Sequence, residues 1–88
     1  MDTIQNETRA VHMIWLPLES KMLASVAYDD RQHILYLRFR KTGDVYRYFE
    51  FPVTDYHAFL EAESKGRFFL AHIRGCFRYE RLTKLQAA

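Results

Sequence analysis

The sequence predicts an α+β domain: a three-stranded antiparallel meander followed by two short helices packed on one face of the sheet, allowing for an extra edge segment from the N- or C-terminal flank. Apolar and polar residues alternate through 33–40, which is the period of a half-buried strand. Short links on both sides favour antiparallel neighbours. After Pro52, apolar residues recur at helical spacing. A chain of 88 residues accommodates one core of this kind.

The predicted strands are separated by polar turns. Leu35, Leu37 and Phe39 share one face of the central strand, and Gly43 provides a positive φ in the turn that follows it. The last strand is rich in aromatic and β-branched residues, which suit a pleated surface. In chain order we predict strand 23–28, turn 29–32, strand 33–40, turn 41–44 and strand 44–51.

The length of the second turn decides which side chains share a face. With Thr42-Gly43 as a two-residue loop, Tyr46 and Tyr48 lie on the apolar face of the central strand, and the opposite face carries Arg38, Arg40 and Arg47. A loop of three or five residues would exchange the faces of the third strand. It would then direct Arg47 into the core, where an unpaired charge costs several kcal/mol. We therefore favour the two-residue loop.

Two short helices follow the strands. The first begins just after Pro52 and ends at Ser64–Gly66, where Gly66 is expected to adopt left-handed geometry. The second spans 67–74 and ends at Gly75. Residues 1–10 form a polar tail, and the apolar segment 11–18 is expected to lie extended over the core or at a sheet edge. Residues 76–88 fit a strand, a helix or both in turn.

Composition excludes several classes of protein. One cysteine forms no internal disulfide and no cysteine-based zinc site. The longest uncharged stretch has nine residues, far short of a membrane span, and no secretory signal is recognised. His72 and Cys76 are four residues apart, but Gly75 separates them and no orienting group is evident. We therefore expect a cytoplasmic protein that has no catalytic residues, metal or cofactor and is not an enzyme.

Charge is distributed unevenly along the chain. Residues 1–30 carry a net charge of −3, whereas residues 31–88 carry +5. Nine of the 13 basic residues are arginines, whose planar guanidinium suits phosphate and stacks on aromatic rings. A solvated surface accounts for such a bias, and so does a face that binds nucleic acid.

An ordered set of residues from Ser20 to about Gly75 resembles the KTSC domain, a small module found at the C-terminus of some lysyl-tRNA synthetases and as stand-alone bacterial or phage proteins. The matching residues are Ser20, the strand Leu23–Asp29 with its Tyr-Asp ending, Phe39, Tyr46-Arg47-Tyr48-Phe49, Phe51-Pro52, Tyr56, Leu60, Ser64–Phe69 and Ile73-Arg74. The resemblance implies one α+β module whose role is unknown or suggested to be RNA binding, and it attaches no catalytic residue. We place the KTSC-like domain at 19–76, between an N-terminal flank (1–18) and a C-terminal tail (77–88).

These observations favour a non-catalytic module that binds RNA or another single-stranded nucleic acid. Aromatic rings would stack on bases and basic groups would neutralise phosphates. The candidate residues are Arg38, Arg40, Arg47, Tyr46, Tyr48, Lys65, Gly66, Arg67 and Arg74, with Lys41 beside them. Lys65, Gly66 and Arg67 are expected to form an anion site at the start of the second helix.

Each candidate also has a structural interpretation. The two tyrosines suit a sheet core, the arginines suit a solvated surface, and Gly66 suits a simple helix cap. An alternative function is a protein-interaction or self-associating module that uses the apolar segment 11–18, because Trp and Met are common at interfaces.

Overall fold

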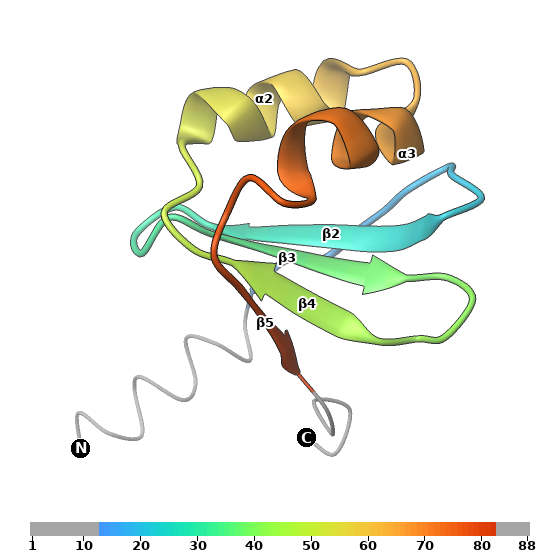
Figure 1. The fold of residues 1–88 in the computed structure, drawn as a ribbon, viewed down its shortest axis with the longest axis horizontal. Coiled ribbons are helices and arrows are strands. Elements are labelled where there is room, and N and C mark those ends of the chain that lie inside the picture. The colour runs from blue at the N-terminus through green and yellow to red at the C-terminus, as the bar shows by residue number, and fades with distance from the viewer. Residues whose placement is uncertain (1–12, 83–88) are drawn as a thin grey trace.

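The computed structural model describes residues 13–82 and has the predicted α+β class. Five antiparallel strands form one sheet in the order β1-β2-β3-β4-β5. Their bounds are β1 Leu16–Pro17, β2 Leu23–Asp29, β3 Ile34–Phe39, β4 Val45–Tyr48 and β5 Tyr79–Leu82. The two edge strands, β1 and β5, come from the N- and C-terminal flanks, so the described part of each flank adds a strand. Figure 1 shows β5 beside β4.

The helices connect β4 to β5 and lie on one side of the sheet (Figure 1). Helix α2 spans Val53–Glu61 after Pro52, and helix α3 (Lys65–Phe68) continues into a wider π-helical turn, η1 (Phe69–Ile73). Proline is well tolerated at a helix start because it has no N–H to leave unsatisfied. No helix within residues 13–82 is long and apolar enough to span a membrane.

The main core lies between the sheet and the helices. Leu35 and Leu37 of β3, Phe51, Phe59 of α2 and Ile73 of η1 are among its fully or almost fully buried side chains. Alternation along β3 places Leu35 and Leu37 on this side, as the sequence predicts. Burial of such side chains contributes about 1.5–3 kcal/mol each relative to exposure.

A second apolar cluster covers the other face of the sheet. It contains Ala27, Ile34, Tyr36 and Val45, with Met13, Trp15, Phe49 and Leu82 packed against it. The Trp15 ring meets the Tyr36 ring edge to face at 6.2 Å. Both flanks therefore contribute to this second cluster as well as to the sheet.

The β3–β4 register corrects the predicted turn. Arg38 pairs with Val45 and Leu37 with Tyr46, so Arg40–Gly43 form a four-residue loop instead of a two-residue one. The loop is closed by the amide of Phe39 donating to the carbonyl of Asp44 and by the amide of Gly43 donating to that of Phe39. The difference is an even number of residues, so Tyr46 and Tyr48 keep the predicted face.

One predicted glycine geometry is wrong. Gly66 lies inside α3 and is not among the residues with positive φ, whereas Gly43 (φ 78°) and Gly75 (φ 81°) are. The first helix ends earlier, at Glu61, and Ala62 caps it with extended backbone. Because the chain leaves α2 through extended residues, no left-handed residue is needed there. Residues 1–12 and 83–88, which include the predicted polar tail, lie outside the described residues.

Candidate functional site

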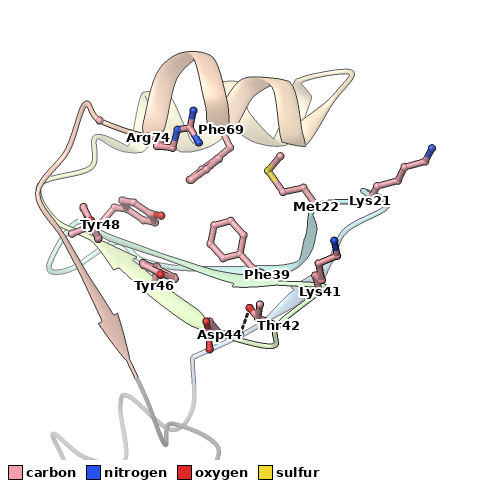
Figure 2. A pocket seen from close by; sticks show the side chains of 12 residues that line it. Lys21, Met22, Phe39, Lys41, Thr42, Asp44, Tyr46, Tyr48, Phe69 and Arg74 are labelled. Atoms are coloured by element: carbon pink, nitrogen blue, oxygen red, sulfur yellow. Dashed lines mark hydrogen bonds between the residues drawn. The ribbon is translucent and has the colours of Figure 1, made fainter.

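A groove of about 720 Å³ opens on the helix side of the sheet, between the end of η1 and strands β3–β5 (Figure 2). The sheet forms its floor, and the loops before β2 and after β3 form one end. The residues that line it are Lys21, Met22, Phe39, Lys41, Thr42, Asp44, Tyr46, Tyr48, Phe69, Arg74, Gly75 and Tyr79.

The floor of the groove is aromatic. The Tyr46 ring lies 5.8 Å from the Tyr79 ring and 5.4 Å from the Phe39 ring. Phe69 packs edge to face on Phe39 at 5.3 Å and anchors η1 to the sheet. Tyr79 is 58% exposed, whereas Tyr48 is 4% exposed. Tyr79 therefore offers an exposed ring, whereas Tyr46 is partly buried and Tyr48 packs against both rings.

Strand pairing brings these rings together. Tyr48 lies opposite Leu35 on β3 and opposite Tyr79 on β5, while Tyr46 lies opposite Leu37 and Arg81. Directly opposed residues share a face of an antiparallel sheet. Arg81 is therefore on the groove side of β5.

Three cationic side chains stand at the rim: Lys21 before β2, Lys41 in the β3–β4 loop and Arg74 after η1. All three are exposed, and no carboxylate of the described residues forms an ion pair with them. Arg74 has extended backbone and precedes Gly75 with its φ of 81°, so the chain turns sharply as it leaves η1. Figure 2 shows Arg74 at the helix side of the groove and both lysines at its other end.

Burial makes the Tyr48 phenol harder to ionise. Desolvation raises the pKa of Tyr48 well above the ordinary value of 10.0, and the neighbouring Tyr46 and Tyr79 raise it further. A neutral, apolar floor beneath a cationic rim suits a ligand with flat rings and negative groups.

The structure brings Tyr46, Tyr48 and Arg74 of the predicted site residues to the groove. Arg38 and Arg47 lie on the opposite face of the sheet. Arg38 donates to the carbonyl of Gly43 at 3.1 Å and its guanidinium lies 5.5 Å from the Trp15 ring.

Arg47 already has an anionic partner. Its Nε donates to Glu80 at 2.7 Å. Burial lowers the pKa of Arg47, but the interactions with Glu80 and Tyr36 together outweigh it, so the pKa is raised. Its guanidinium also lies 5.3 Å from the Phe49 ring. These contacts hold Arg47 to β5 and its own strand.

Arg40 lies in the β3–β4 loop and crosses to the segment before β2. Its Nε donates to the carbonyl of Ser20 at 2.8 Å, and Nη2 donates to those of Leu18 at 2.9 Å and Leu23 at 3.3 Å. Its hydrogen-bonding capacity is thus largely used within the fold.

The predicted helix-start anion site is occupied by the protein's own groups. The Ser64 hydroxyl accepts the backbone N–H of Arg67 at 3.1 Å, as an N-cap residue does. Lys65 Nζ donates to the carbonyl of Ala62 at 2.6 Å. Gly66 faces Met22, and the Arg67 side chain is exposed. This segment is separate from the aromatic floor.

Sequence reasoning missed several groove residues. Lys21 and Tyr79 lie in segments without clear periodicity, and the sequence places Phe69 only within the predicted helix 67–74 and within the family resemblance. The sequence places Asp44 where the predicted turn 41–44 meets the predicted strand 44–51. The pairing of β5 with β4 would have identified Tyr79, but this pairing is not specified by the short sequence 79–82 alone. Within residues 13–82, no cluster of His, Cys, Asp and Glu could hold a metal ion.

Comparison with known proteins confirms the resemblance seen in the sequence. The KTSC domain family model matches residues 19–79. A crystal structure of a KTSC domain protein from Yersinia pestis has a TM-score of 0.77 at 34% identity and covers 81% of this chain and 99% of that one.

Sequence relatives differ widely in length. Over 65 residues the chain is 34% identical to a lysine–tRNA ligase of Nostoc sp., covering 74% of this chain and 11% of the ligase. It is 39% identical over 62 residues to a protein of Tsukamurella paurometabola, covering 70% of this chain and 91% of that protein. The chain thus corresponds to a small part of the ligase and to nearly all of the Tsukamurella protein.

Proposed function

The chain belongs to the KTSC domain family, and we propose that it is a non-catalytic module that binds single-stranded RNA in the aromatic groove above β4. The observation that carries this proposal is the exposed ring of Tyr79 beside the partly buried ring of Tyr46, together with the cations Lys21, Lys41 and Arg74, which have no ion-pair partner among the described residues. Aromatic rings stack on unpaired bases with about 1–3 kcal/mol per base, and the cations neutralise phosphates.

The form of the groove favours a single strand over a duplex. Its rings lie on a floor between η1 and the β3–β4 loop, which bases reach when they are unstacked from a partner strand. The lysine–tRNA ligase relative is named for an enzyme that acts on tRNA, and a region of that protein is similar to this chain. This supports RNA as the first ligand to test.

The function is tested by fluorescence anisotropy with a labelled mixed-sequence RNA of about 12 nucleotides, within the length range of known single-strand sites. With three phosphate contacts, log affinity should fall against log salt with a slope of about −2. Absence of measurable binding at about 50 mM salt, where electrostatic attraction is strong, would contradict the proposal. A DNA of the same sequence shows whether the ribose contributes.

Two substitutions locate the binding surface. Tyr79→Ala removes an exposed ring, and we expect about a fivefold or greater loss of affinity. Arg74→Ala should weaken binding and reduce the salt slope by about 0.7. Arg31→Ala is the matched control, because Arg31 is an exposed arginine in the β2–β3 turn with no role in the groove. Equal losses for Arg31→Ala and Arg74→Ala would indicate non-specific charge attraction.

Self-association is the second candidate function. Trp15 is packed against Tyr36, but Ile14 is 75% exposed, and Leu16, in the short edge strand β1, is 39% exposed. Such exposed apolar side chains suit an interface. Light scattering on the full chain tests this: a dimer has twice the chain mass of 10.6 kDa, and Ile14→Asp should restore the monomer. A monomer at all concentrations tested would contradict this candidate.

A further inference from the structure

We infer that the groove prefers guanine, and that the Asp44 carboxylate recognises the Watson–Crick edge of that base; this inference rests on the proposed function. Asp44 is the acidic residue among those that line the groove. A carboxylate there opposes phosphate binding, so its presence among three cations needs another explanation.

The Asp44 carboxylate has no structural task among the described residues. The β3–β4 loop is closed by backbone groups and by the Thr42 hydroxyl, which accepts the Asp44 amide at 3.1 Å. No described side chain forms a hydrogen bond or ion pair with the carboxylate. Asp44 is half-buried and lies at the groove wall near Thr42, with Tyr46 close by (Figure 2).

Strand geometry places Asp44 beside a base stacked on Tyr46. Asp44 directly precedes β4 and is two residues before Tyr46, and both line the groove. In extended backbone, residues two apart lie on the same face about 6.7 Å apart. A base lying on the Tyr46 ring therefore presents one edge toward Asp44. At that edge the carboxylate offers two acceptor oxygens and no donor.

Guanine matches this pair of acceptors. Its Watson–Crick edge presents two adjacent donors, N1–H and N2–H. Adenine and cytosine each have a ring-nitrogen acceptor next to their amino group, and uracil has a carbonyl on each side of its N3–H, so none of the three presents two adjacent donors. A bidentate bond to a carboxylate is charge-assisted, and good bidentate pairs give roughly tenfold discrimination or more. An arginine or lysine at the rim would instead recognise guanine through O6 and N7.

The test measures, by fluorescence anisotropy at low salt, the affinity of the protein for oligouridines of about 11 nucleotides that differ only in their central residue. The RNA with a central guanosine should bind about tenfold more tightly than the all-uridine RNA. The RNA with a central inosine, which lacks the amino group, should have an intermediate affinity. The 7-deaza and 2′-deoxy forms of guanosine should retain the preference. Loss of preference with 7-deazaguanosine would assign recognition to a cation, and loss with deoxyguanosine would assign it to the ribose; either result overturns the inference.

Substitution of Asp44 completes the test. Asp44→Asn should abolish the guanosine preference and tighten binding of the all-uridine RNA, because it removes a negative charge from the groove. Asp30→Asn is the matched control, since Asp30 is exposed in the β2–β3 turn and carries the same charge. Circular dichroism melting confirms that each variant is folded. Tight but equal binding of all RNAs, or a preference that survives Asp44→Asn, would overturn this inference alone, whereas no binding of any RNA would overturn the proposed function.

Discussion

Arg47 and Glu80 face each other across β4 and β5, with Arg47 Nε donating to the Glu80 carboxylate at 2.7 Å. The pair lies on the sheet face away from the helices, where Arg47 and Arg78 also lie against the Phe49 ring. A guanidinium predicted as a phosphate ligand thus connects the C-terminal strand to the sheet. Its position explains why β5 can present Tyr79 to the groove on the other face.

A double-mutant cycle on Arg47→Ala and Glu80→Ala should give a coupling energy of about 0.5–1 kcal/mol in urea unfolding. The value is small because both side chains are partly exposed, at 33% and 51%. The coupling should decrease as salt is raised. Additive effects of the two substitutions would show that the pair does not hold β5.

Arg40→Ala should lower the free energy of unfolding by about 1–2 kcal/mol, because three backbone carbonyls lose a charged donor. Arg40→Lys should recover only part of this, since one ammonium does not reproduce the fork of a guanidinium. Urea unfolding of both variants measures the effect. Unchanged stability combined with weaker RNA binding would instead assign Arg40 to phosphate contact.

Two glycines should respond to alanine in opposite directions. Gly75→Ala should destabilise the protein by about 1 kcal/mol, because a φ of 81° is costly for a residue with a Cβ. Gly66→Ala should stabilise it by about 0.5 kcal/mol, because alanine favours the helix and the new Cβ meets Met22 at an ordinary 3.6 Å. Thermal melting measures both. A loss of stability in Gly66→Ala would mean that α3 requires glycine.

Alkaline pH should destabilise the fold through Tyr48. Its pKa is raised in the folded state, mainly by burial, so its contribution to stability is complete below pH 10 and decreases as pH rises above that value. The melting temperature should therefore fall as pH rises above about 10, and Tyr48→Phe should reduce this fall. Burial also raises the pKa of Tyr28 and Tyr56, so some pH dependence should remain. Tyr36→Phe, which removes a phenol on the other face of the sheet, is the matched control. An identical pH profile in wild type and Tyr48→Phe would contradict the prediction.

The faces of the central strands could be predicted because period-two alternation and the cost of burying Arg47 are local signals. The loop length could not, because Arg40 bonds to carbonyls about twenty residues earlier in the chain, and nothing in residues 40–44 reveals that partner. The even difference in register preserved the faces of Tyr46 and Tyr48.

The candidate site was only partly predictable for a similar reason. Tyr46 and Arg74 stand out as an aromatic and a basic residue in a basic half of the chain. Their neighbours Lys21 and Tyr79 reach the groove through the pairing of β5 and the path of the loop before β2. Charge composition indicates how many cations exist, but the partners already present in the fold decide which of them face a ligand.

The apolar cluster on the sheet face away from the helices limits how far the protein can be shortened. The cluster around Tyr36 is covered by Met13, Trp15 and Leu82. All three lie outside residues 19–79, which match the family. A fragment trimmed to 19–79 would retain both helices and most of the groove. It would also expose Ile34, Tyr36 and Val45, and we expect it to aggregate unless another chain shields them.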